Sequence, residues 1–109
     1  MDISEPLKPA VVHILLALAD DERHGYAIMQ AVRDQSNGAV PLRTGSFYRH
    51  LSQLIKAGLV AEAATKRHGD DPRRGAYYRL TPRGRDALNA ERARLVELLA
   101  AFPNTRRAR

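Results

Sequence analysis

The polar side chains between Thr44 and Ala57 are of the types that contact DNA. Apolar residues recur through this stretch at helical spacing and predict a helix, capped by Thr44, with one stripe facing a core. The opposite side carries Ser46, Tyr48, Arg49, Ser52, Gln53 and Lys56. Arginine and glutamine suit base edges, whereas serine, tyrosine and lysine suit phosphates. The face contains no acidic residue, which favours DNA contact, although an amphipathic surface helix explains the same alternation.

A second group of cations surrounds a polar connection between two predicted strands. This connection, residues 67–75, contains glycine, proline and two aspartates, so we expect an exposed hairpin tip. The basic residues in and beside this connection are Lys66, Arg67, Arg73 and Arg74. Such a loop beside a recognition helix can reach the DNA backbone or a neighbouring groove. The alternative is that Asp70 and Asp71 simply neutralise a solvated turn.

Arg83 and Arg85 fall in the first turn of the last predicted helix, where the helix dipole disfavours cations. A phosphate docked at this terminus would reverse that cost. The alternative is that two arginines on an exposed surface are tolerated at this position without any ligand.

Charge is distributed unevenly along the 109 residues, whose formal net charge is +6. Residues 1–42 hold three basic and six acidic side chains, a net charge of −3. Residues 43–109 hold fifteen basic and six acidic side chains, a net charge of +9. A basic half of this size indicates a polyanionic partner or, alternatively, a solubilising surface.

The sequence has few residues in patterns that could form a catalytic or metal-binding site. The chain has no cysteine, and its four histidines show no metal-ligand spacing. These histidines are His13, His24, His50 and His68. We therefore expect no enzyme activity, no metal and no cofactor.

The apolar stretches are too short for a membrane span. The longest, Ala10–Ala19, is interrupted by His13, and the amino terminus is acidic rather than basic. We expect a soluble cytoplasmic protein with no membrane association.

The order of the predicted elements indicates an α+β, mostly α fold of the winged helix-turn-helix type. Helices are expected over residues 7–20, from about 24 to 35, and 44–57. Two strands, residues 59–66 and 76–80, would form the wing. Thr81 and Pro82 then supply the cap and first residue of a final helix that ends before Pro103.

The final helix has the pattern of an interhelical seam. Leu88, Leu95 and Phe102 recur every seven residues, with Leu98 and Leu99 between them. Little core of a small winged domain is left to cover such a helix, so a second copy of the chain is the expected partner. We predict a DNA-binding domain over residues 1–81, a dimerisation helix over 82–103 and a basic tail over 104–109.

Several motifs resemble the PadR family of winged-helix regulators, in the right order and over nearly the whole chain. They are His24-Gly25-Tyr26, Gly45-Ser46-Phe47-Tyr48-Arg49-His50-Leu51, Ala57-Gly58-Leu59-Val60, Asp71-Pro72-Arg73-Arg74, Tyr77-Tyr78-Arg79-Leu80 and Thr81-Pro82-Arg83-Gly84. The length resembles the short branch of that family, which has a single helix after the wing.

The resemblance implies a sequence-specific repressor that binds double-stranded DNA, at a pseudo-palindromic operator, as a homodimer. The first and last helices would form the interface, which places Val11, Leu15 and Leu18 there beside the last helix. Tyr48 and Arg49 match the family's tyrosine-arginine pair, and Ser46 matches its hydroxyl residue. The resemblance also implies relief by a small aromatic effector. This chain has no tryptophan to stack on such a molecule, which departs from some family members.

Overall fold

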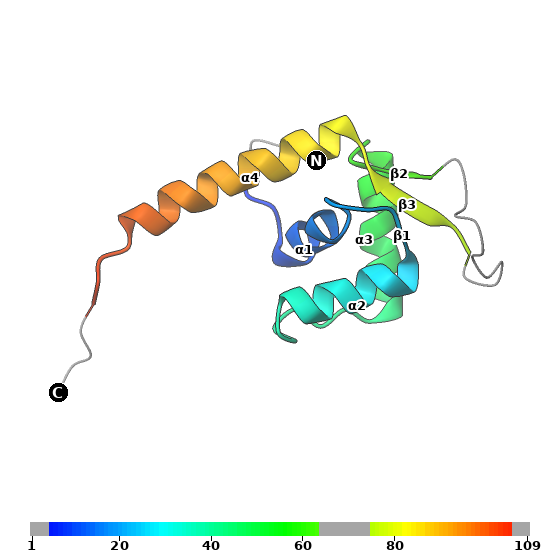
Figure 1. The fold of residues 1–109 in the computed structure, drawn as a ribbon, viewed down its shortest axis with the longest axis horizontal. Coiled ribbons are helices and arrows are strands. Elements are labelled where there is room, and N and C mark those ends of the chain that lie inside the picture. Colours follow the sequence, from blue (N-terminus) through cyan, green and yellow to red (C-terminus); the bar gives the residue numbers. More distant parts are fainter. Residues whose placement is uncertain (1–4, 64–74, 106–109) are drawn as a thin grey trace.

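A computed structural model describes residues 5–63 and 75–105 of the chain (Figure 1). Four helices and three short strands make up the fold. In chain order they are α1 (Pro9–Ala17), β1 (Arg23–His24), α2 (Gly25–Gln35), α3 (Thr44–Lys56), β2 (Val60–Glu62), β3 (Tyr77–Leu80) and α4 (Pro82–Ala101). The expected mostly helical winged-helix fold is confirmed. The predicted wing cations Lys66, Arg67, Arg73 and Arg74 lie outside the described residues.

The core is built around α1, which packs against α2, α3 and α4. Ile14 and Leu15 are fully buried, together with Ile28 of α2 and Phe47 of α3. The helix is shorter at both ends than the predicted residues 7–20. Pro9 occupies its start, where a missing N–H costs nothing.

The burial of α1 corrects the predicted dimer interface. Val11, Leu15 and Leu18 are 2%, 0% and 2% exposed within a single chain, so no surface of theirs is left for a partner. Their contacts are with the core of their own chain. The large apolar residue that α1 leaves exposed is instead Leu16, at 45%.

The ends of α2 follow the sequence signals. His24 caps the helix, its Nδ1 accepting a hydrogen bond from the Ala27 N–H at 3.2 Å. Asn37 and Gly38 follow the helix with φ of 52° and 77°, the left-handed conformation that these residue types tolerate. The predicted termination of α2 is confirmed.

The start of α3 differs by one residue from the prediction. Arg43 is the N-cap, with extended backbone and no side-chain hydrogen bond, and Thr44 is the first helical residue. The expected capping role of Thr44 is therefore wrong. At the other end Gly58 has φ of 80°, and the chain turns there into β2.

The sheet has three antiparallel strands in the order β1-β3-β2. Two of them were predicted, whereas β1 is a two-residue strand paired through Arg23 with Tyr78 and through His24 with Tyr77. Tyr77 is buried and Tyr78 is half-buried, on opposite faces of β3 as strand geometry requires.

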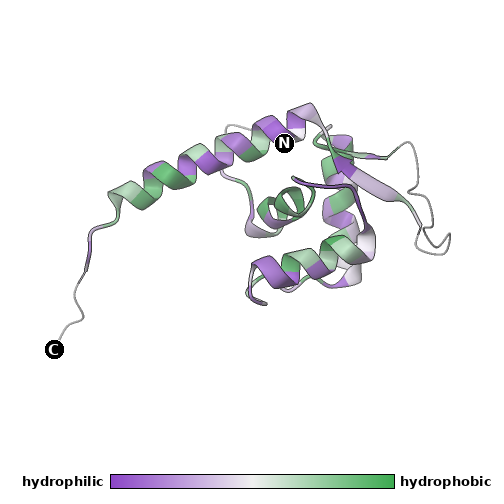
Figure 2. Ribbon diagram, in the orientation of Figure 1, coloured by the Kyte–Doolittle hydropathy of each residue, from purple (hydrophilic) through white to green (hydrophobic). Residues whose placement is uncertain are grey.

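The last helix, α4, runs over the body for its first half and then projects away from it (Figures 1 and 2). Thr81 Oγ1 accepts from the Gly84 N–H at 2.9 Å, which confirms the predicted cap. Glu91 is the last buried residue of α4, and every residue from Leu95 to Thr105 is exposed. No helix in residues 5–63 and 75–105 is both long enough and apolar enough to cross a bilayer.

Hydrogen bonds and close packing join the start of α4 to the end of α3. Thr81 Oγ1 donates to the Gly58 carbonyl at 2.6 Å, and Arg83 Nε donates to the Ala57 carbonyl at 3.1 Å. Arg85 reaches the Ala19 carbonyl after α1 at 3.4 Å. Carbonyls within the chain therefore accept hydrogen bonds from both arginines. Gly84 approaches Leu59 so closely that a Cβ would overlap the Leu59 carbonyl oxygen.

We expect Gly84→Ala to lower the free energy of unfolding by about 1–3 kcal/mol, because the Leu59 carbonyl is backbone and cannot move aside cheaply. Gly45→Ala is the matched control, since Gly45 also lies in the first turn of a helix and a Cβ added there would meet no atom within 4 Å. That control should be neutral or slightly stabilising. Urea unfolding measures both, and equal stabilities of the two variants would contradict the packing argument.

Candidate nucleic-acid interface

The predicted DNA-contacting residues of α3 form one solvent-accessible face. Six residues along this face are exposed: Thr44, Tyr48, Arg49, Ser52, Gln53 and Lys56. Ser46 is half-buried, and its Oγ donates to the Arg43 carbonyl at 3.1 Å. The other side of the helix carries Phe47, Leu51 and Leu54, which are buried. The core thus fixes the rotation of α3 and leaves its polar face free.

The exposed face of α3 is cationic or neutral along its whole length. Arg43 precedes the helix and Lys56 ends it, with no aspartate or glutamate between them. In Figure 1 the helix stands beside the sheet, with α2 at its lower end. Cations and amide or hydroxyl groups of this kind can bind phosphate and base edges together.

Tyr48 lies against the start of α2. A Cβ on Gly25 would be 2.5 Å from the Tyr48 hydroxyl oxygen, so only glycine admits the ring in this position. The Phe47 and Tyr48 rings meet edge to face with centroids 4.9 Å apart. Tyr48 remains 45% exposed, so one part of the ring is held while another faces solvent.

The sheet contributes tyrosines beside this helix. Burial raises the pKa of Tyr78, and the neighbouring Tyr48 and Glu62 raise it further. His24 meets the edge of Tyr77 with ring centroids 5.5 Å apart and stacks on Tyr26 at 6.5 Å. The raised pKa keeps the Tyr78 hydroxyl protonated at neutral pH. The contacts of the His24 ring link β1 to β3 and to α2.

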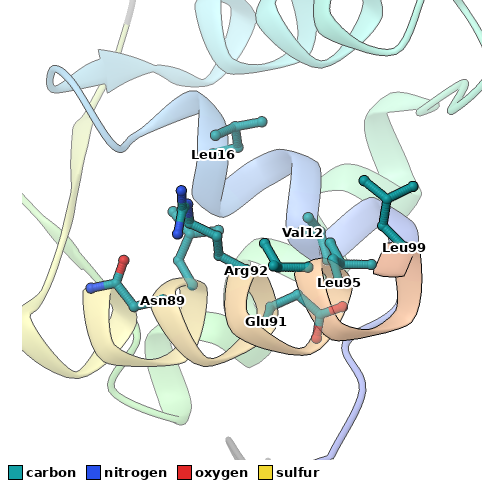
Figure 3. Close-up of a pocket in the computed structure, with 9 residues that line it drawn as sticks. Val12, Leu16, Asn89, Glu91, Arg92, Leu95 and Leu99 are labelled. Atoms are coloured by element: carbon teal, nitrogen blue, oxygen red, sulfur yellow. The ribbon is translucent and has the colours of Figure 1, made fainter. Parts of the chain in front are cut away.

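A second candidate surface lies between α1 and α4, where a groove of about 350 Å³ opens (Figure 3). Its walls are almost entirely apolar: Val12, Leu16, Leu88, Leu95, Val96 and Leu99, with Asn89, Glu91 and Arg92 beside them. The predicted interface residues Leu95, Leu98, Leu99 and Phe102 are 44%, 45%, 70% and 66% exposed. Leu88 is half-buried against the core.

Sequence reasoning missed Val12, Leu16 and Glu91 in this region. The first helix is apolar nearly all round, so its pattern does not say which side a neighbour covers. Glu91 had a usable signal, since it lies three residues after Leu88 and four before Leu95, on the apolar stripe. In the part of the chain that the structure describes, no cluster of three or more histidine or acidic side chains could hold a metal ion.

The comparisons with known proteins identify a family and a fold for this chain. The family model "Transcriptional regulator PadR-like family" matches residues 14–90. A comparison with curated proteins found no matching sequence.

Among solved structures, RosR of H. salinarum is 23% identical with a TM-score of 0.70, over 93% of this chain and 84% of that one. A PadR family transcription regulator from Clostridium difficile is 20% identical with a TM-score of 0.66, over 84% and 94%. A PadR-like transcription factor from Bacteroides fragilis ("bacteroid fragilis") is 22% identical with a TM-score of 0.66, over 83% and 82%. At these identities the likeness is one of fold.

The pKa of His50 provides a test of how α3 packs against the rest of the chain. Burial lowers its pKa, and the positive charges of Arg49 and Lys8 lower it further. Since the unfolded chain binds a proton near pH 6.5 and the folded chain does so only at lower pH, the free energy of unfolding should fall as pH drops through about 6.5. His50→Gln should reduce that fall between pH 8 and 5.5 in urea unfolding. A variant that loses as much stability as the wild type over this range would contradict the assignment.

Proposed function

The chain belongs to the PadR-like family of DNA-binding transcriptional regulators, and from this premise we propose that it is a repressor that binds a pseudo-palindromic operator as a homodimer. Each copy would place α3 in a major groove, with Arg49 and Gln53 at base edges. Thr44, Ser46, Tyr48 and Lys56 would contact the sugar-phosphate backbone. The wing cations Lys66, Arg67, Arg73 and Arg74 are proposed to add further phosphate contacts.

The observation that carries this proposal is the exposed face of α3, free of acidic side chains. A solvated helix with no other role usually mixes both signs of charge. Here the buried stripe of Phe47, Leu51 and Leu54 holds the helix, and the cations and amide of the opposite side remain accessible. That arrangement suits a helix that binds a polyanion by its outer side.

The homodimer is supported by the uncovered half of α4. Leu95, Leu99 and Phe102 are exposed on a segment that projects beyond the body of the chain (Figure 1). Two or three isolated helical turns are marginal in water, and most helical stability comes from packing of an apolar face. A second copy related by a two-fold axis would cover this face and the α1–α4 groove, making residues 82–103 a dimerisation helix.

We propose that a small effector binds in this same groove, between the two copies of the chain. About 350 Å³ lies at the lower end of the range for small-molecule sites. The walls are aliphatic, and no aromatic side chain lines them. An apolar ligand would therefore be selected by shape and dispersion, rather than by the ring stacking that an aromatic effector uses elsewhere in the family.

We expect Arg49→Ala to weaken binding to the preferred operator by about 5- to 150-fold while changing binding to random duplex DNA much less. A base contact adds discrimination, whereas a phosphate contact adds affinity for every sequence. Fluorescence anisotropy at several salt concentrations measures both. The matched control is Arg33→Ala, at the end of α2 that lies away from α3, which should change affinity less than about twofold (Figure 1). Uniform weakening across sequences would reassign Arg49 to phosphate, and salt-independent wild-type binding would contradict DNA binding.

The dimer is tested by placing charges on the projecting half of α4. Leu95→Asp combined with Leu99→Asp should convert the dimer to a folded monomer, because both residues are exposed in one chain and an interface would bury the new charges. Affinity for a two-half-site operator should then fall by a factor of about 100 or more. Sedimentation velocity and circular dichroism measure the two effects. Glu97→Gln on the same helix is the control, and a double variant that remains dimeric would contradict the proposed seam.

A further inference from the structure

Glu91 is the one charged side chain that is buried among the described residues, with 4% of it exposed. It lies in the middle of α4 and is the last buried residue before the helix leaves the body. Burying a carboxylate costs free energy unless other groups satisfy it. The contacts of Glu91 therefore indicate what this position does.

Two groups hold the Glu91 carboxylate. The backbone N–H of Leu7, 84 residues away in sequence, donates to Oε1 at 3.2 Å. Arg94, one turn further along α4, donates through Nε to the same oxygen at 3.3 Å and through its terminal nitrogen to Oε2. The Arg94 hydrogen bond is the main reason that the pKa of Glu91 is lowered, and the Leu7 N–H adds to it against the effect of burial.

These contacts attach α4 to the segment that precedes α1. Leu7 packs against the core, and α1 begins two residues later at Pro9. Figure 1 shows this segment passing α4 before it descends into α1, and Figure 3 shows the Glu91 carboxylate pointing away from Leu16. The helix thus contacts both α1 and the segment before it at the point where its exposed half begins.

We propose that Glu91 is a positioning residue that fixes the angle between α4 and the winged-helix body, and thereby sets the spacing of the two recognition helices in the dimer. This inference rests on the proposed homodimer, because the exposed half of α4 would form its seam. The molecule measures 29 Å along its second axis. A rotation of about 10° over such a lever moves its far side by roughly 5 Å, more than the ~3.4 Å rise of one base pair.

The first test measures the angle without DNA. The chain lacks cysteine, so Arg33→Cys supplies a single spin label on α2 in an otherwise native protein. The wild-type dimer should give one narrow distance between the two labels by double electron–electron resonance. Glu91→Ala should broaden or displace that distance, and Arg94→Gln should do so to a smaller extent. Glu97→Gln, on the same helix and exposed, should reproduce the wild-type distance.

The second test measures the consequence on DNA. An operator selected from random duplexes by the wild-type protein is rebuilt with one or two base pairs inserted or removed between its half-sites. Wild-type affinity should fall on the order of tenfold at the wrong spacing, and Glu91→Ala should flatten this preference to about threefold or less, or move its optimum. A residue that only stabilises the fold would not change the spacing preference of the folded dimer.

The outcomes separate this inference from the proposed function. A folded, dimeric Glu91→Ala with the wild-type label distance and spacing preference would overturn the positioning role alone. A wild-type protein with no distance between labels would overturn the dimer, and the positioning role with it. If Glu91→Ala does not fold, Arg94→Gln decides, since Arg94 is partly exposed at 37%. If neither variant folds, Glu91 is a stability residue and the inference is wrong.

Discussion

The close contact between the start of α4 and the turn after α3 is the constraint on which the rest of the arrangement depends. Gly84 packs on the Leu59 carbonyl where no side chain fits, and Thr81 and Arg83 donate to the carbonyls of Gly58 and Ala57. These two carbonyls belong to the C-cap residue of α3 and the residue after it, which lie beyond the hydrogen bonds of the helix itself. Because the donors come from the start of α4, the end of α3 and the first turn of α4 are joined at this corner.

A second constraint is the position of α1 inside this corner. Ile14 and Leu15 are fully buried, so α1 serves as the interior wall against which α2, α3 and α4 are placed. Two further apolar side chains of this helix, Val12 and Leu16, face the groove beside α4. The same helix therefore holds α3, which carries the candidate DNA-binding face, through the core, and it supplies one wall of the surface that a second copy would cover in the proposed dimer. Packing density makes such an element transmit displacement rather than absorb it.

Much of the fold was predictable because its signals are local. Thr81 with Pro82 starts α4 and Asn37 with Gly38 ends α2, each through its own backbone preferences. β1 was missed because two residues have no period and become a strand only by pairing with Tyr77 and Tyr78, more than fifty residues away. The error at Val11, Leu15 and Leu18 has a similar origin: an apolar residue indicates that something covers it, but not whether the cover is the same chain or another.

The first half of α4 is held by the body and the second half is exposed. In the proposed dimer, the position of α3 would therefore depend on both chains. The first turn of α4 is packed against the turn after α3 at Gly84, whereas the residues from Leu95 to Phe102 are exposed in their own chain. A partner packed on the second half of α4 would therefore affect the position of α3 only through α4 itself. The position of α3 depends on that partner only if α4 is stiff where it leaves the body. At this point the buried carboxylate of Glu91 joins α4 to the segment before α1. In the proposed dimer, a ligand in the neighbouring groove would contact α4 at this same point, so that a small displacement there would change the placement of both copies of α3.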